Sequence, residues 1–190
     1  MERIKLVKPE KKHASSVKDY VKEHADHGEF DIHGGALVEK LTYDAWLQQL
    51  ADNADKATTL PGWVLSSTFL AIRESDNQLI GMVDIRHELN ESLRYYGGHI
   101  GYSVRPSARK RGYATQIVVE ALDFCRSIGL KKVLLACYKD NLASRNTITK
   151  CGGVFEKEIL LETSLPETGC HEQKEVQLFW ITLTDSTIHS

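Results

Sequence analysis

A short cationic turn in the second half of the chain has the residue types that bind anions. Four cationic side chains fall within seven residues, and a glycine follows them: Arg105, Arg109, Lys110, Arg111 and Gly112. Glycine carries no Cβ, so a phosphate can approach its backbone closely. A helix that begins here would add unpaired N–H groups and the positive end of its dipole. The turn therefore predicts a binding site for a diphosphate or a similar polyanion.

The elements on either side place this turn at the end of a strand. Residues 99–104 alternate in polarity as a strand does, and apolar residues recur at helical spacing over 112–127. Residues 133–138 form a short apolar run, typical of a strand that is covered on both faces. Such a unit predicts a right-handed crossover between parallel strands, and open α/β sheets bind ligands beyond the carboxyl ends of these strands. Charge alone leaves a solvated turn as an alternative, but the position favours an anion site.

The remaining elements complete a mixed α/β sheet. We expect strands over 3–8, 67–73, 79–86, 154–161 and 176–183, and helices after Pro9, after a capping Thr42 and over 142–150. The second and third strands are predicted to form an antiparallel hairpin, because Ser75-Asp76-Asn77 between them are turn residues. This order of elements predicts helices on both sides of the sheet.

Composition restricts the class of protein. With 190 residues, 42% of them hydrophobic, the chain fits a single globular domain over residues 1–190. A net charge of −2 confines any anion site to a local patch, and the four cysteines lack the spacing of a zinc site or a disulfide scaffold. The N-terminus is too charged for a signal peptide, and no apolar run approaches the ~18 residues of a membrane span. We therefore expect a cytoplasmic protein with no metal and no membrane partner.

Three segments together resemble the GNAT superfamily of acetyl-CoA-dependent N-acetyltransferases. Residues 109–114, Arg-Lys-Arg-Gly-Tyr-Ala, fit that family's signature of Gln or Arg, two variable residues, Gly, one variable residue, and Gly or Ala. Residues 101–106 precede it as the expected strand, and residues 141–144, Asn-Leu-Ala-Ser, open a helix that ends at Gly152-Gly153. The resemblance covers residues 63–183. It implies a mixed, mostly antiparallel central sheet of about six to seven strands with a splayed parallel pair, flanked by about four helices.

The resemblance implies acetyl-CoA as co-substrate and direct transfer of its acetyl group to a primary amine of a small molecule or a peptide. Backbone groups of Ser103, Val104 and Arg105 are expected to pair with the pantetheine arm, and the Val104 N–H to stabilise the oxyanion of the reaction. Asn141 and Ser144 are expected to contact the pantetheine and the adenine end. The diphosphate is expected to lie against the N–H groups of one run of residues: Arg109, Lys110, Arg111, Gly112, Tyr113, Ala114 and Thr115.

The resemblance does not fix the acid and the base. Many members carry a glutamate near the start of the fourth strand, where this chain has His99, so His99 is the candidate base. Ile148 stands at the position of the family's tyrosine acid, which leaves Tyr138 as the candidate acid. A structural histidine and a packing tyrosine are the alternatives. The segment after the third strand is expected to line the acceptor side, and ordinary surface positions are the alternative: Arg86, His87, Glu88 (a second candidate base) and Asn90.

Three functions are compatible with these residues. An N-acetyltransferase is the first. A CoA-binding or regulatory domain without catalysis is the second, and the isoleucine at position 148 supports it. A nucleic-acid module that uses residues 105–113 is the third, but the negative net charge and the lack of a second basic stripe argue against it. Many members of the family dimerise, so a homodimer is an alternative to a monomer.

Overall fold

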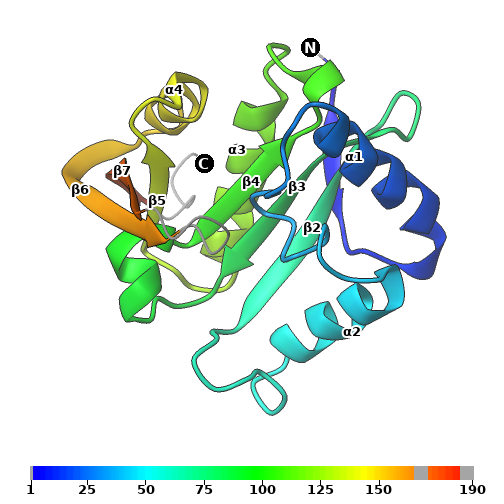
Figure 1. Cartoon of the computed structure of the whole chain (residues 1–190), viewed down its shortest axis with the longest axis horizontal. Helices are drawn as coiled ribbons and strands as arrows, with labels where there is room; N and C mark the ends of the chain where they lie inside the picture. Colours follow the sequence, from blue (N-terminus) through cyan, green and yellow to red (C-terminus); the bar gives the residue numbers. More distant parts are fainter. Residues whose placement is uncertain (1, 165–170, 185–190) are drawn as a thin grey trace, which may run out of the picture.

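Two antiparallel sheets that lie side by side form the centre of the molecule (Figure 1). The computed structural model describes residues 2–164 and 171–184. The first sheet has the order β1-β2-β3-β4, with strands Ile4–Val7, Ser66–Arg73, Leu79–Arg86 and Ile100–Val104. The second has the order β5-β7-β6, with strands Lys132–Tyr138, His171–Thr182 and Val154–Ser164. The α-helices are α1 (Ala14–Asp26), α2 (Tyr43–Asn53), α3 (Tyr113–Ser127) and α4 (Leu142–Lys150), and shorter helical segments cover Lys11–His13, Leu93–Gly97 and Pro106–Ala108.

The mixed α/β architecture predicted from the sequence is confirmed, with one difference in the sheet. The strands of the described residues are divided between two sheets instead of forming one central sheet. Within these residues no ladder joins β4 to β5, so the predicted parallel pair is not a hydrogen-bonded pair along its length. The two strands meet at one point, His99, whose side chain explains the separation and is described with the site.

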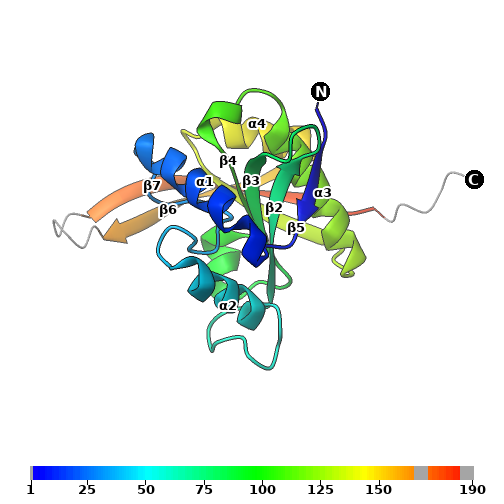
Figure 2. The same cartoon turned by 90° about the vertical axis from the view of Figure 1, so that its right-hand side faces the viewer.

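The first sheet is buried on both faces. Helix α3 covers one face of this sheet, and α1 and α2 cover the other (Figure 2). Along β2 and β3, Phe69 and Val83 belong to the core on the α3 side, while Leu70 and Met82 belong to a second core with α1 and α2. Burial on both faces is the reason that both strands have nearly continuous apolar sequences. The sheet therefore forms a rigid wall between the two helical layers.

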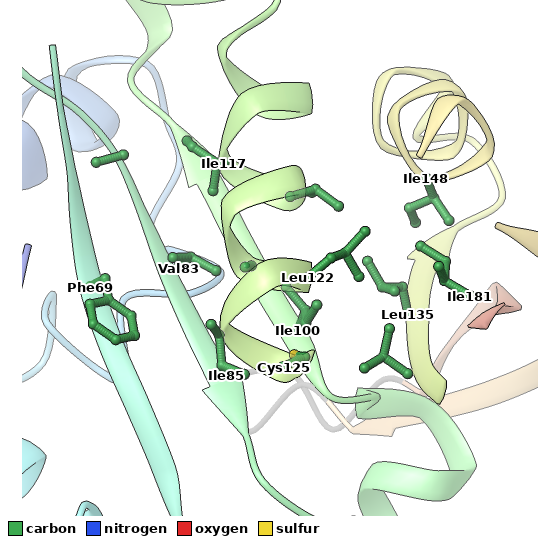
Figure 3. Close-up of a cluster of buried hydrophobic side chains, with 14 of the residues drawn as sticks. Phe69, Val83, Ile85, Ile100, Ile117, Leu122, Cys125, Leu135, Ile148 and Ile181 are labelled. Carbon is green, nitrogen blue, oxygen red and sulfur yellow. The ribbon is translucent and has the colours of Figure 1, made fainter. Parts of the chain in front are cut away.

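The larger core surrounds α3 and joins the two sheets (Figure 3). The predicted apolar stripe of α3 is buried there, and it ends at the C-cap residue Ile128, which is 36% exposed. Gly129 follows with a φ of 86°, the left-handed conformation expected after a helix. Ile148 of α4 is fully buried in the same core, so its position in α4 faces the protein interior.

The loop between α1 and α2 is fixed against β4. The predicted cap Thr42 accepts the Ala45 N–H (3.4 Å), and the buried Trp46 of α2 donates its Nε1–H to Gly35 O (2.8 Å). Gly34 packs so closely on β4 that an added Cβ would lie 2.4 Å from Gly101 O. This loop therefore lies against β4 at Gly101 and Tyr102.

Across residues 2–164 and 171–184, no helix combines the length and the apolarity needed to cross a membrane. The same residues contain no group of three or more His, Cys, Asp or Glu side chains placed to hold a metal ion.

Candidate active site

The edge of β4 that faces β5 carries backbone groups that pair with no other strand. Arg105 N–H donates to Ile80 O and Arg86 N–H donates to His99 O, both at 2.8 Å, so the odd-numbered residues of β4 pair with β3. Neighbouring residues of a strand turn their N–H and C=O groups to opposite sides. Of the three residues predicted to offer backbone groups to a ligand, Ser103 and Arg105 are therefore already paired with β3. The free groups are those of Tyr102 and the N–H of Val104, because the Val104 C=O accepts a bond from Arg109 Nε.

β5 presents a similar edge toward β4. Lys139 N–H donates to Glu175 O of β7 (2.9 Å), so the alternate residues Leu134, Ala136 and Tyr138 turn their backbone groups toward β4. The two rows, residues 100, 102 and 104 of β4 and residues 134, 136 and 138 of β5, are termed the divergent edges below. Both groups of Leu134, the Val104 C=O and the Tyr138 C=O are bonded within the protein. The remaining groups of the two rows supply both donors and acceptors to a chain that lies between them.

His99 joins the two sheets where the divergent edges meet. Its N–H donates to Leu134 O (2.7 Å), and Leu134 N–H donates to its Nδ1 (2.9 Å). A side chain stands where a backbone carbonyl would continue the ladder, so β4 and β5 separate beyond this point. His99 is 5% exposed, and burial, with nearby Arg94 and Arg86, lowers its pKa to about 4. The Nδ1 lone pair accepts the Leu134 N–H, so the neutral ring carries its proton on Nε2 and has no free lone pair. The geometry therefore favours the structural alternative over a proton acceptor.

Helix α3 begins at the end of β4 without a capping side chain. Gly112 occupies the N-cap position with a φ of 82°, and no side chain among the described residues accepts a bond there. The N–H groups of the first turn are therefore available, which is the arrangement that binds anions. Lys110 also has a positive φ, 60°, and the side chains of Lys110 and Arg111 are exposed. This part of the predicted diphosphate site thus has the expected donors.

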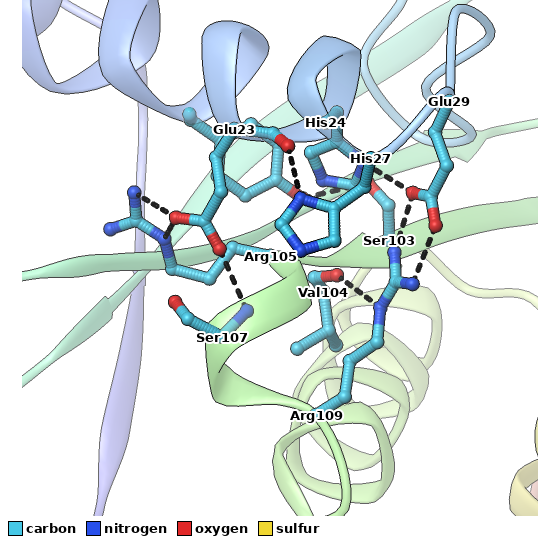
Figure 4. A network of polar contacts seen from close by, with 10 residues as sticks. Glu23, His24, His27, Glu29, Ser103, Val104, Arg105, Ser107 and Arg109 are labelled. Carbon is cyan, nitrogen blue, oxygen red and sulfur yellow. Dashed lines mark hydrogen bonds and ion pairs between the residues drawn. The ribbon is translucent and has the colours of Figure 1, made fainter.

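Two of the four predicted cations pair with carboxylates of the protein (Figure 4). Arg105, 8% exposed, donates its Nε–H to Glu23 Oε2 (2.8 Å), and Glu23 Oε1 also accepts the Ser107 N–H (2.7 Å). Arg109 donates from its two Nη atoms to Glu29 (2.5 and 2.6 Å) and from its Nε to Val104 O (3.0 Å). The Arg109 backbone N–H is also occupied, since it donates to Pro106 O (3.3 Å).

These pairs change the charge of the turn. The Arg109 guanidinium, followed by His24, lowers the pKa of Glu29 to about 2, so this carboxylate is ionised at neutral pH. Burial opposes ionisation of Glu23, but the Ser107 N–H and Arg105 outweigh it and lower its pKa. Of the four cations of the turn, Lys110 and Arg111 are therefore the two without a carboxylate partner among the described residues.

Helix α4 begins beside the same edges. The predicted ligand Asn141 acts as its N-cap, with Oδ1 accepting the Ser144 N–H (3.0 Å). Ser144 Oγ lies 3.0 Å from the hydroxyl of Tyr102, which links α4 to β4. Burial raises the pKa of Tyr102 to about 12, so the hydroxyl stays protonated and this link carries no charge. The divergent edges are thus bordered by the starts of α3 and α4.

Tyr138 lies at the end of β5, beside a loop histidine. Its ring is 6.3 Å from that of His33, in an edge-to-face arrangement, and Lys174 Nζ lies 5.3 Å from the Tyr138 ring centroid. A pocket of about 400 Å³ adjoins Tyr138; its lining is Tyr138, Lys139, Asp140, Gln173, Lys174 and Glu175. His33 is exposed and adjoins Gly34, the residue that packs on β4.

The residues predicted for the acceptor side do not gather at one place. Arg86 pairs with the buried Asp84 (Nε to Oδ2, 2.9 Å) on the face of β3 toward α1 and α2. His87 turns the other way, with Nε2 3.0 Å from Ser67 Oγ and its ring near Phe124 of α3. Burial lowers the pKa of His87.

The other two residues of this segment lie on its outer side. Asn90 accepts the Leu93 N–H with Oδ1 and donates from Nδ2 to Gly62 O, both at 2.9 Å, so its side chain fixes two loops. Glu88 is exposed. The geometry therefore leaves Arg86 as the member of this segment that lies close to Gly101 and β4.

Three residues at the site were missed by sequence reasoning: Glu23, Glu29 and His33. Glu23 lies on the polar face of α1, and the other two lie in an irregular loop, so no periodic pattern marks them. The arginine partners of Glu23 and Glu29 are 80 or more residues away in sequence. A weak signal existed in the excess of cations at 105–111, which calls for carboxylates from another part of the chain.

Residues 3–154 match the family described as acetyltransferase (GNAT) domain. The ribosomal-protein-S5-alanine acetyltransferase from Vibrio fischeri has a similar structure, with a TM-score of 0.69 and 18% identity over 96% of this chain and 93% of its own. The microcin C7 self-immunity acetyltransferase MccE, solved with acetyl-CoA and AMP, has a TM-score of 0.68 and 16% identity over 96% and 93%. YncA from Salmonella typhimurium, solved with its cofactor acetyl-CoA, has a TM-score of 0.59 and 14% identity over 97% and 96%.

No curated protein matches the sequence. At identities this low, the likeness to the three solved structures concerns the fold.

Proposed function

The chain belongs to the GNAT acetyltransferase family, and from this premise we propose that it transfers the acetyl group of acetyl-CoA directly to a primary amine of a small molecule or a peptide. The observation that carries the proposal is the pair of divergent edges, which end at the uncapped start of α3. A ligand with amide groups along its length and a diphosphate at one end matches the donors and acceptors of this arrangement.

The residues present fit acetyl-CoA at each of its parts. The amides of the pantetheine arm would lie along the free groups of Tyr102, Val104 and Ala136. The diphosphate would lie against the N–H groups after Lys110, with the Lys110 and Arg111 side chains beside it. Two of the structures with a similar fold contain acetyl-CoA, MccE and YncA, which adds support by analogy.

Acetyl-CoA supplies an acetyl group on a thioester, which an unprotonated amine can attack. The protein places that group at the divergent edges, where the Val104 N–H is a donor for charge that develops on the acetyl oxygen. Tyr138 is the proposed acid for the departing thiolate, and the neighbouring His33 is an imidazole that can accept the proton of the amine. His99 fixes the meeting point of the strands and acts as a positioning residue.

The experiment that tests this function is an acceptor screen. Purified protein is incubated with acetyl-CoA and polyamines, aminoglycosides, amino acids or short peptides, and the release of free thiol is followed. Peptides that begin with alanine are included because one structure with a similar fold is a ribosomal-protein-S5-alanine acetyltransferase. We expect release above background hydrolysis with at least one class of amine, and a mass increase of that amine by one acetyl group.

A CoA-binding domain without catalysis predicts a different result. It would bind CoA, seen as a thermal shift, while no amine of the panel would release thiol. Ile148 is buried in the core, so α4 places no acid at that position. Acid catalysis must then come from another residue such as Tyr138, and thiol release that disappears in Tyr138→Phe would favour the enzyme.

A further inference from the structure

Arg109 is held at three points before any ligand binds. Its Nε donates to Val104 O (3.0 Å), and its two Nη atoms donate to the two oxygens of Glu29 (2.5 and 2.6 Å). The bonds connect the end of β4, the start of the turn and the segment after α1 (Figure 4). A bidentate pair of this kind fixes the guanidinium in direction as well as in place. Three of the five N–H donors of the guanidinium are thereby used within the protein, and two remain.

Glu29 is itself fixed from the opposite side. Its Oε2 lies 2.7 Å from Nδ1 of His24, which is 2% exposed in α1. Burial lowers the pKa of His24, so the ring is neutral at neutral pH and carries its proton on Nδ1 when it donates to Glu29. The adjacent Tyr20 of α1 donates its hydroxyl to Ser103 Oγ of β4 (3.0 Å). The carboxylate thus has little freedom to follow Arg109 if the turn moves.

The residue that follows Arg109 has an unfavourable backbone conformation. Lys110 has a φ of 60°, in the left-handed region that residues other than glycine, asparagine and aspartate rarely adopt. Gly112, with a φ of 82°, adopts the same region without that cost. Strained residues of this kind persist where the surrounding structure holds them in place. Arg109 directly precedes Lys110, and its three bonds are the contacts that can hold Lys110 in this conformation.

We propose that Glu29 is a positioning residue of the acetyl-CoA site: by clamping Arg109 it keeps Lys110 left-handed, which aims the following N–H groups at the diphosphate. The inference rests on the proposed function, because acetyl-CoA is the ligand whose diphosphate these groups would hold. It also gives α1 a part in donor binding. A competing account makes the opposite prediction. If Glu29 instead occupied Arg109 in place of the diphosphate, its removal would free the guanidinium and strengthen binding.

The test measures CoA affinity by calorimetry, which needs no acceptor. Glu29→Gln is expected to raise the Kd for CoA about tenfold, ~1.4 kcal/mol, the size of the cost of one left-handed residue. Arg109→Lys keeps the charge but cannot form the bidentate pair with Glu29, so it is expected to raise the Kd for CoA by a similar factor. Asp31→Asn is the matched control, since it removes one carboxylate from the same loop where it pairs with Lys40 (3.2 Å). It is expected to leave the Kd unchanged.

Substitutions at Lys110 separate strain from charge. Lys110→Gly and Lys110→Ala both remove the cation, but glycine adopts the left-handed conformation freely. With Glu29 present, the two variants are expected to bind CoA equally. In the Glu29→Gln background, Lys110→Gly is expected to restore about tenfold of affinity relative to Lys110→Ala. Equal affinities in that background, or CoA binding by Glu29→Gln as tight as or tighter than wild type, would overturn the proposal.

A readout without ligand keeps this test apart from the proposed function. Two amides bracket Lys110: Arg109 N–H donates to Pro106 O and Gln116 N–H donates to Gly112 O, both at 3.3 Å. Their hydrogen exchange is expected to accelerate about tenfold in Glu29→Gln and to slow again when Lys110→Gly is added. Unchanged exchange refutes the clamp even if CoA binds. Accelerated exchange in a protein that binds no CoA supports the clamp and refutes the proposed function.

Discussion

Replacing Gly112 with glutamate is expected to weaken acetyl-CoA binding at least ~100-fold. Gly112 has a φ of 82°, and an L-residue with a side chain in this conformation costs about 1–2 kcal/mol. The new carboxylate would lie at the start of α3 and take the favourable position of the phosphate there. Repulsion between like charges ~4 Å apart adds about 1–4 kcal/mol, depending on solvent exposure. Titration calorimetry with acetyl-CoA measures the loss.

The other end of α3 offers a matched control. Gly129 has a φ of 86°, and nothing lies within 4 Å of a Cβ added to it. Gly129→Glu therefore introduces the same charge and a similar backbone strain, with the whole of α3 between it and the proposed site. Normal acetyl-CoA affinity is expected in this variant. Wild-type affinity in a folded Gly112→Glu protein would show that the diphosphate lies elsewhere.

Replacing His99 with leucine is expected to lower the free energy of unfolding by about 2–4 kcal/mol. Leucine fills a similar volume, but the buried Leu134 N–H loses its acceptor, and an unpaired buried N–H costs about 1–3 kcal/mol. The ring contact with Trp180, at 6.2 Å between centroids, is lost as well. Because His99 joins the two sheets, chemical denaturation is a direct measure of this effect.

Asparagine at the same position separates the structural role from a chemical one. Its Oδ1 can replace Nδ1 as the acceptor for Leu134 N–H, but an amide cannot accept a proton from an amine at neutral pH. His99→Asn is expected to recover most of the stability lost in His99→Leu and to retain turnover with any acceptor found in the screen. A stable His99→Asn protein without turnover would restore His99 as the candidate base.

Elements with a strong local signal were predicted well from the sequence. The apolar stripe of α3 keeps helical spacing over four turns, and its buried face is the one expected. The Thr42 cap and the hairpin of β2 and β3 likewise depend on neighbouring residues alone. The start of α3 near Gly112 was also predicted, because the helical spacing begins there; the left-handed conformation of Gly112 was not part of that prediction.

Features that depend on distant pairs were not predictable in this way. The sequence shows four cations in the turn, but it does not show that Glu23 and Glu29 neutralise two of them, because those carboxylates approach through the packing of α1 on β4. The division of the sheet has the same origin. His99 has the pattern of an ordinary strand residue, and its bond to Leu134 depends on how β5 is placed by the crossover helix. Long-range geometry, not residue type, decided both points.

The most direct test of the central claim is a crystal structure of the protein with acetyl-CoA. The account predicts the diphosphate against the N–H groups that begin α3, the pantetheine arm between β4 and β5 on the side of Tyr102, Val104 and Ala136, and the thioester near Tyr138. Arg109 should still hold Glu29 in that complex. Acetyl-CoA bound on another surface, or with its diphosphate away from Gly112, would contradict the account.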